Sequence, residues 1–426
     1  MSRPVSTQRQ VMLSLAISAY FLSYAFRVAP STLSVQLATS FHANASAMGL
    51  MSSAYFWVTV LMQIPAGMLS DRLGPRRLIT GGCAVLGMGA LLFGVTEIYA
   101  WAVCARILIG LGASVLFVSM IKLVAVHYPP ERFATITGLG MLLGASGSVA
   151  AGAPLAWGAA YFGWRELSLF FGVVTFVVGV LSWFNMADTR PRRGEDIKRL
   201  GDSPPWHRTA LDLLELHQIR LGFMVNLGFT GSFMSFSGLW MGSILVQAKG
   251  LSLADSGLYS SLFFMAFAIG SQIIGRLSDV SGSRRTLIIL TGFSFLIAMT
   301  GLTQPAITSG YPLAINLLIM GLSASGFTLS WACAKDAAPA TSAGLAVSVV
   351  NTGGFLGAAL LQQLGGLIMD RHRLQADDFS AYDARDFQLC LWLHMGVLLI
   401  GLLAATGLRD KASEQASATA GSRPKG

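Results

Sequence analysis

The chain has few charged residues and few cysteines that could form disulfides or bind a metal. Only 12% of its 426 residues are Asp, Glu, Lys or Arg, whereas 54% are hydrophobic. A water-soluble domain of this length cannot bury so much apolar surface. No disulfide frame or metal site is expected, because the four cysteines lie in apolar segments without paired spacing: Cys83, Cys104, Cys333 and Cys390. No cofactor is expected either, because the glycine-rich GLGASV at Gly110 follows no strand and lies within an apolar stretch.

Acidic residues are missing from the middle of every long apolar stretch. All 20 Asp and Glu lie in polar connections, in the tails or within a few residues of the end of such a stretch, as Glu97 and Asp255 do. Proton-driven exporters of lipophilic cations rely on a carboxylate in mid-membrane. Its absence counts against multidrug export. A coupling proton would need an edge acid, His394 or a carboxylate on the solute itself.

The apolar stretches have the length of membrane helices, since about 20 residues cross the hydrocarbon core. The first is too long for a signal peptide and should remain as helix 1. We expect an all-α membrane protein with twelve transmembrane helices, at 11–38, 47–69, 78–96, 99–124, 134–157, 166–186, 217–247, 253–276, 286–304, 310–334, 342–370 and 387–408.

The net charge of +9 does not indicate a nucleic-acid partner, which would need Lys and Arg gathered on one soluble face. These residues sort by side of the membrane instead. If the N-terminus is cytoplasmic, only five of the 29 lie in outer loops: Arg165, Lys249, Arg371, Arg373 and Arg385. The positive-inside rule therefore predicts a multi-pass protein of the inner membrane with both termini in the cytoplasm.

One charged segment occurs twice. GMLSDRLGPRR, Gly67 to Arg77, returns 208 positions later as GRLSDVSGSRR, Gly275 to Arg285, and each copy lies between two apolar segments. Such a repeat indicates two related halves. We expect a cytoplasmic tail (1–10), a six-helix bundle (11–186), a basic linker (187–216), a second six-helix bundle (217–408) and a disordered tail (409–426). Leu211 to Leu216 could form an amphipathic helix or a plain connector.

The repeated turn has residues that could hold one cytoplasmic arrangement of the helices through charged contacts. Gly67 and Gly74 permit close packing and a tight reversal, and Asp71 can pair with Arg76 or Arg77. The alternative is a positive-inside turn that only fixes topology. The candidate gating residues are Asp71, Arg72, Gly74, Arg76 and Arg77 in the first copy and Asp279, Arg284 and Arg285 in the second.

Twelve helices, a central linker and a G-x-x-x-D-R-x-G-x-R-R turn after helix 2 resemble the major facilitator superfamily from about Val11 to Leu408. The resemblance implies two pseudo-symmetric bundles, and a turn that holds them together on the cytoplasmic side when the cavity opens outward. The segments FRVAPS and LMQIPAG resemble those of bacterial permeases for organic acids or amino acids.

Two arginines within helices are the main candidates for substrate binding, because ionisable groups in the membrane are costly. Arg27 shares a polar stripe of helix 1 with Tyr20, Tyr24 and Ser31. Arg106 lies in RILIGLGAS, which is similar to the family's R-x-x-x-G-x-G pattern in helix 4. Gly110 and Gly112 of this segment should let a neighbouring helix come close. The resemblance implies that helices 1 and 4 line the cavity, where both guanidiniums could bind an anion. Alternatively, each arginine binds backbone carbonyls or snorkels outward.

The second half offers neutral candidates. Asn226 and Trp240 share a face of helix 7, and Asn316 lies on a face of helix 10 with Trp331. These faces could form a cavity wall, or could simply pack helix against helix. Helix 5 reads GASGSVAAGAPLAWG and lacks the Gly-Pro and paired glycines of the family's antiporters.

Together these features predict a secondary transporter, not an enzyme, that moves a small anionic solute by alternating access, with a proton as the candidate coupling ion. The expected partners are the solute and the lipid bilayer, and the expected state is a monomer. The alternatives are an efflux antiporter, a transporter of metal chelates and a non-transporting component of a membrane complex.

Overall fold

The structure is a computed structural model that describes residues 5–187, 206–339, 342–372 and 382–410. These residues form helices and connections, with no β-strand among them. Within this described part, twelve helices are long and apolar enough to cross a membrane, as predicted: 7–32, 45–62, 65–95, 99–127, 131–150, 164–185, 217–248, 253–281, 284–302, 310–337, 343–372 and 384–405. The expected disordered tail lies almost wholly outside the described residues.

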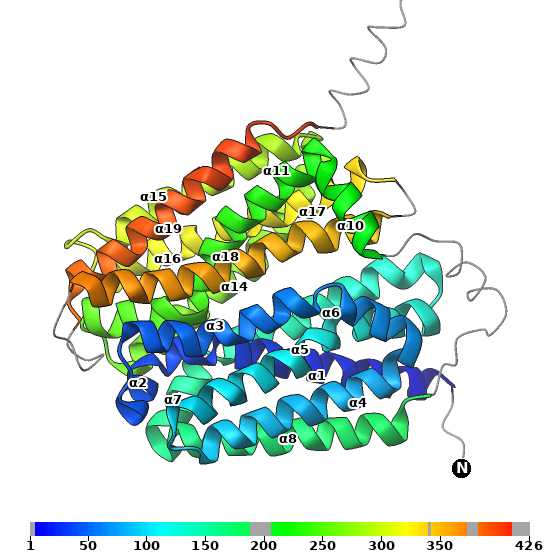
Figure 1. Cartoon of the computed structure of the whole chain (residues 1–426), viewed down its shortest axis with the longest axis horizontal. Helices are drawn as coiled ribbons and strands as arrows, with labels where there is room; N and C mark the ends of the chain where they lie inside the picture. Colours follow the sequence, from blue (N-terminus) through cyan, green and yellow to red (C-terminus); the bar gives the residue numbers. More distant parts are fainter. Residues whose placement is uncertain (1–4, 188–205, 340–341, 373–381, 411–426) are drawn as a thin grey trace, which may run out of the picture. The chain divides into compact units, whose positions relative to one another are not determined.

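The first half differs from expectation at its first helix. Helix α1 begins at Val5, and the expected span 11–38 is divided by a turn at Leu33. Figure 1 shows α4 and α8 running side by side. The helices of this half are α1 (Val5–Thr32), α2 (Ser34–Phe41), α3 (Ala45–Met62), α4 (Pro65–Val95), α5 (Tyr99–His127), α6 (Pro130–Ala150), α7 (Ala153–Phe162) and α8 (Trp164–Asn185).

The later half contains irregular helical turns. Its seventh membrane helix includes three π-helical turns, and its tenth tightens to a 3-10 turn. The elements are α10 (Trp206–Glu215), α11 (His217–Val225), η1 (Asn226–Thr230), α12 (Gly231–Ser235), η2 (Phe236–Trp240), α13 (Met241–Ser243), η3 (Ile244–Ala248), α14 (Leu253–Ser281), α15 (Arg284–Leu302), α16 (Gly310–Ala324), η4 (Ser325–Thr328), α17 (Leu329–Ala337), α18 (Ala343–His372) and α19 (Ala384–Ala405).

By internal contacts the described residues form two compact units. The first unit holds 5–187 with 236–264, 362–372 and 382–387, and the second holds 206–235, 265–361 without 340–341, and 388–410. The first unit therefore includes pieces of the second sequence half. The division into bundles 11–186 and 217–408 remains a prediction from the repeat.

Glycines bring α4 and α5 into backbone contact in the first unit. A Cβ at Gly112 would collide with the carbonyl oxygen of Gly82, and one at Gly110 would collide with the backbone of Tyr55 in α3. Small residues permit such approach, and close packing is a main source of helix association in lipid. The expectation that Gly110 and Gly112 admit neighbouring helices is confirmed.

The fifth membrane segment, expected as one helix over 134–157, breaks between α6 and α7. The break leaves backbone groups that an α-helix would pair, and lipid offers them no partner. Ser261 of α14 serves two of them: its hydroxyl donates to the Val149 carbonyl at 2.8 Å and accepts from the Ala153 N–H at 2.8 Å. Thr32 donates to the Ala151 carbonyl at 2.5 Å. Gly152 is required here, because a Cβ would collide with Ser261.

A carboxylate from α18 caps the start of α3 within the same unit. Asp370 accepts from the backbone N–H of Ala45 at 3.2 Å and of Ser46 at 3.0 Å, and also from the Tyr382 hydroxyl. The N–H groups at a helix start have no partner within the helix, so an anion is favoured there. Burial, followed by the hydrogen bond to Asp370, raises the pKa of Tyr382.

Candidate substrate site

Helix α1 carries a polar stripe in the first unit. The Tyr20 hydroxyl donates to the Tyr24 hydroxyl at 3.2 Å, and the Tyr20 ring stacks on Phe117 with centroids 5.1 Å apart. The Arg27 guanidinium lies 4.2 Å from the centre of the Tyr24 ring. Tyr20 is buried, while Tyr24 and Arg27 are half-buried. Tyr20, Tyr24 and Arg27 of the predicted stripe therefore form a row of contacting side chains, whereas Ser31 accepts from the Gly242 N–H at 3.0 Å.

Tyr55 of α3 links the two predicted arginines. Its hydroxyl accepts from Nε of Arg27 at 3.2 Å. The two guanidiniums lie near its ring, at 5.7 Å for Arg27 and 5.3 Å for Arg106 from the ring centre. An aromatic ring attracts cations through its negative face, so Tyr55 stabilises two charges held on different helices. Sequence reasoning missed Tyr55, because it is neutral and lies 28 residues from Arg27.

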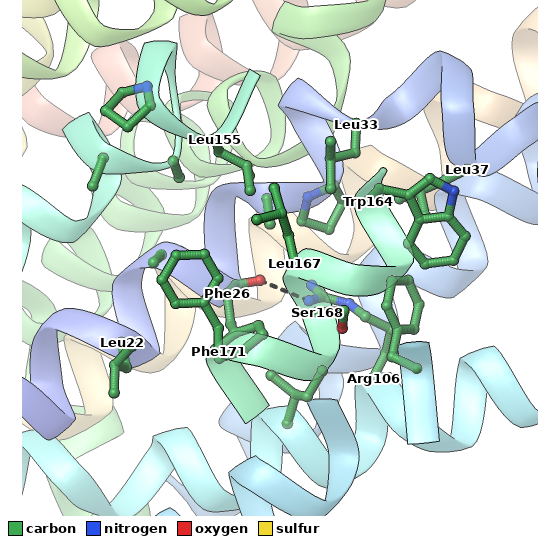
Figure 2. A pocket seen from close by; sticks show the side chains of 18 of the residues that line it. Leu22, Phe26, Leu33, Leu37, Arg106, Leu155, Trp164, Leu167, Ser168 and Phe171 are labelled. Carbon is green, nitrogen blue, oxygen red and sulfur yellow. Dashed lines mark hydrogen bonds between the residues drawn. The ribbon is translucent and has the colours of Figure 1, made fainter. Parts of the chain in front are cut away.

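Arg106 of α5 lies deeper than Arg27. Its side chain is fully buried, and Nη1 donates to the backbone carbonyl of Phe26 at 2.8 Å. Figure 2 shows this hydrogen bond among the apolar side chains of a pocket. One nitrogen of Arg106 thus binds a backbone carbonyl, as the alternative interpretation expected. Contact of Arg106 with a transported solute stays a prediction.

The repeated turn is built differently from the expected pairing. Asp71 pairs with Lys122 of α5 at 2.7 Å, and both side chains are exposed. Arg76 instead donates to the Trp183 carbonyl at 2.9 Å and stacks on its ring at 4.4 Å. Gly74 has φ of 76°, a conformation that favours glycine. A Cβ at Gly67 would meet nothing, so the expected close packing at Gly67 is not observed.

The second copy of the turn also reaches another helix. Arg284 forms an ion pair with Asp336 at the end of α17. Asp410 accepts from the Arg285 N–H at 2.9 Å and from the Ser283 hydroxyl at 2.9 Å. Both turns therefore tie a helix end to a neighbour by charge. Whether Asp71, Arg72, Gly74, Arg76, Arg77, Asp279, Arg284 and Arg285 gate transport stays a prediction.

Asn226 lies at the centre of a neutral network in the second unit. Its amide donates to Ser330 at 2.5 Å and to the Gly222 carbonyl at 3.2 Å. Its carbonyl accepts from Thr230 at 2.9 Å and from Trp331 at 3.2 Å. An asparagine amide offers two donors and two acceptor lone pairs, and all four are used here.

The other two neutral candidates are packed within their own units. Trp240 is completely buried in the first unit. Asn316 is half-buried in α16 and lies so close to α15 that a Cβ at Gly301 would collide with its amide nitrogen. Roles for Asn226, Trp240 and Asn316 in a substrate pocket stay predictions.

Comparison with known proteins decides the family. The sequence pattern of the Major Facilitator Superfamily matches residues 15–362 and 223–425. The chain belongs to this superfamily. The superfamily consists of membrane transporters, and the family and structural neighbours described below are transporters rather than enzymes. A small-molecule substrate and a membrane environment follow from membership.

Several transporters of known organisms align with most of this chain. The "Probable galactarate/D-glucarate transporter GarP" of Escherichia coli K12 is 25% identical over 86% of this chain and 90% of its own length. The "Probable sulfoacetate transporter SauU" of Cupriavidus necator is 22% identical over 85% and 88%. The "Hexuronate transporter" of Bacillus subtilis is 25% identical over 77% and 80%.

Solved structures support the superfamily fold. The inward-facing, unoccupied form of a bacterial homologue of the human lysosomal transporter Spinster aligns with a TM-score of 0.72 at 15% identity, over 95% of this chain and 98% of that one. At this identity the likeness shows the fold alone.

Proposed function

We propose that this transporter moves a small anionic solute, such as an organic or sugar acid, and that Arg27 binds its acidic group. The observation that carries the proposal is the place of Arg27: a half-buried guanidinium in the polar row of a membrane helix, held by Tyr24 and Tyr55. A charge is costly at that depth, so a function is the default interpretation. A guanidinium binds carboxylate or sulfonate with two parallel hydrogen bonds.

The names of the relatives support the same class of solute. Galactarate, glucarate, hexuronate and sulfoacetate all carry carboxylate or sulfonate groups. Tyr20 and Tyr24 add hydroxyls to the row and could bind the polar body of such a solute. Tyr55 holds the guanidinium in place. The proposal therefore assigns the charge contact to Arg27 and the orienting contacts to tyrosines.

The proposed mechanism is alternating access as a symporter in the inner membrane, with both termini in the cytoplasm and a proton as the coupling ion. The distribution of Lys and Arg supports the orientation. The charged contacts of the two turns, Asp71 with Lys122 and Arg284 with Asp336, are the proposed gating contacts. Each joins two helices and can break when those helices separate.

The test is a thermal-shift screen of purified protein against sugar acids, organic acids, amino acids, phosphorylated metabolites and chelates, followed by uptake into proteoliposomes. We expect a sugar or organic acid to stabilise the protein, and Arg27→Ala to abolish that stabilisation. Arg165→Ala is the matched control, because Arg165 is also half-buried but binds the carbonyls of Gly94 and Thr96. Undiminished binding by Arg27→Ala would overturn the assignment, and flux outward only would favour the efflux alternative.

A further inference from the structure

A pocket of about 260 Å³ lies inside the first unit, between α1, α5, α7 and α8. Its wall is mostly apolar and includes the aromatic side chains of Phe26, Trp164 and Phe171 (Figure 2). Arg106 lies in this wall. Arg27 does not line the pocket, so this is a different place from the proposed solute site.

Arg106 has unmet hydrogen-bonding capacity in this wall. Nη1 is bound to the Phe26 carbonyl, but Nε and Nη2 have no partner among the described residues. The side chain is only 2% exposed. Leaving the donors of a buried charge unpaired is strongly unfavourable. Two nitrogens of this buried cation therefore lack an acceptor at the pocket wall.

The remaining polar group of the wall cannot supply that acceptor. The Ser168 hydroxyl donates to the Ala90 carbonyl at 2.9 Å and lies out of hydrogen-bonding geometry with Nε and Nη2 of Arg106, and no acid lines the pocket. A ligand that matches this wall has one acidic group and an otherwise apolar body. A polyhydroxylated sugar acid does not match, because its hydroxyls would be buried without partners.

The size and position of the pocket narrow the ligand further. An apolar cavity of about 150 Å³ holds benzene, so 260 Å³ accommodates an apolar body of roughly eight to ten carbons. Pro154 is exposed, and Leu155 and Leu167 are half-buried, so the pocket reaches the surface between α7 and α8. Apolar residues of the same helices, Trp157 and Phe170, are exposed on that surface. This apolar surround fits a ligand that enters the pocket from the hydrocarbon layer of the membrane.

We propose that the pocket is a second binding site, for a lipophilic monocarboxylate whose carboxylate pairs with Arg106 and whose body lies against Phe26, Trp164 and Phe171. The shared chemistry fits both a short fatty acid of the membrane and a free aromatic acid. Occupancy would also brace the break between α6 and α7, because Ala150, Ala151 and Pro154 line the pocket. The site does not depend on the proposed transport of sugar or organic acids.

Trp164 permits a direct test in nanodiscs of zwitterionic lipid. We titrate the full-length protein with 8-bromooctanoate and follow quenching of tryptophan fluorescence, taking the difference from Trp164→Phe to isolate that residue. We expect saturable quenching. Arg106→Gln should weaken it at least tenfold, and Ala150→Leu should weaken it by filling the pocket. Ala160→Leu, an exposed position of α7, is the matched control and should leave it unchanged.

A comparison of acid and amide distinguishes specific binding in the pocket from partition of the bromo compound into lipid. The uncharged 8-bromooctanamide should bind at least tenfold more weakly than the acid in the wild type and equally in Arg106→Gln. Equal quenching by acid and amide in the wild type, or no saturable difference, would overturn the proposal. Arg27→Ala should retain the quenching, so the failure of one site is distinguishable from failure of the other. Tighter binding of 3-(4-bromophenyl)propanoate than of 10-bromodecanoate would identify a free aromatic acid as the source, and the reverse order would identify a short fatty acid of the membrane.

Discussion

Corresponding positions of the two halves have opposite character. Arg27 of α1 is related by the 208-residue offset to Ser235 of α12. Arg27 is a half-buried cation held by tyrosines, whereas Ser235 is buried and hydrogen-bonded to Nε2 of His394 at 2.8 Å. Asn226, in the same helix as Ser235, has all its hydrogen-bonding capacity satisfied within the protein.

The difference separates a cation held by aromatic rings, where we propose that the solute binds, from neutral groups that satisfy one another. A neutral network satisfied from within stabilises its helices and has no spare capacity for a solute. A guanidinium braced by aromatic rings keeps its charge available for an anion. The duplication has therefore preserved the turns while the helix interiors have diverged, and solute choice should depend on the first half.

The largest effect should come from replacing Arg27 by Lys. Lysine keeps the positive charge but loses the planar fork that pairs with a carboxylate. We expect solute affinity to fall by about 2 kcal/mol, roughly 30-fold. Titration calorimetry with the solute found by the screen measures the change, and Arg165→Lys should be silent. Wild-type affinity in Arg27→Lys would mean that any cation suffices there.

Asn226→Ala should affect stability rather than affinity. It removes the shared partner of Thr230, Ser330 and Trp331 inside the membrane. We expect a loss of about 1–2 kcal/mol of stability, since hydrogen bonds between membrane helices are individually modest. The loss is measured as a lower melting temperature in thermal denaturation. If affinity instead fell tenfold with little change in melting, Asn226 would belong to the solute site and the contrast between the halves would fail.

Tyr55→Phe should have a smaller effect on binding. The ring remains beside both arginines, but the hydroxyl that accepts from Arg27 is lost. One such hydrogen bond is worth about 0.5–1 kcal/mol, so solute affinity should fall roughly two- to fivefold. Tyr99→Phe, which loses a hydroxyl bonded to the Ala47 carbonyl instead, is a suitable control. An unchanged affinity would show that the ring alone positions Arg27.

The smallest equilibrium effect should come from Asp71→Asn. The Asp71–Lys122 pair is exposed, and such pairs contribute about 0–1 kcal/mol. Binding should therefore change less than twofold, while the rate of uptake into proteoliposomes falls. Lys122→Gln should reproduce the slower rate if the pair is the gating contact. Wild-type uptake in both variants would reduce the turn to a topological signal.

The sequence predicted the features that depend on local pattern. Apolar length located the twelve membrane helices, and helical spacing located the row of Tyr20, Tyr24 and Arg27. Close packing at Gly110 and Gly112 was predicted from residue size. Each of these depends on residues that are near neighbours in the chain.

Contacts between distant segments were not predictable in this way. The Asp71–Lys122 pair spans 51 residues, and the contact of Tyr55 with Arg27 spans 28. Arg76 was expected to pair with Asp71, yet it binds a backbone carbonyl of α8. Many acceptors are chemically equivalent for a charged side chain, so only the packing of helices selects among them.

The break between α6 and α7 has a consequence for biosynthesis. Its free backbone groups are paired by Thr32 and by Ser261, which lies more than a hundred residues later in the chain. While the ribosome has made only the first six membrane segments, the Ala153 N–H lacks this partner in a medium without water, and the Val149 carbonyl has only its 3.1 Å hydrogen bond from the Gly152 N–H. The fifth segment can therefore adopt its final broken form only once the eighth has entered the bilayer, so the first half completes its fold after the second half has begun.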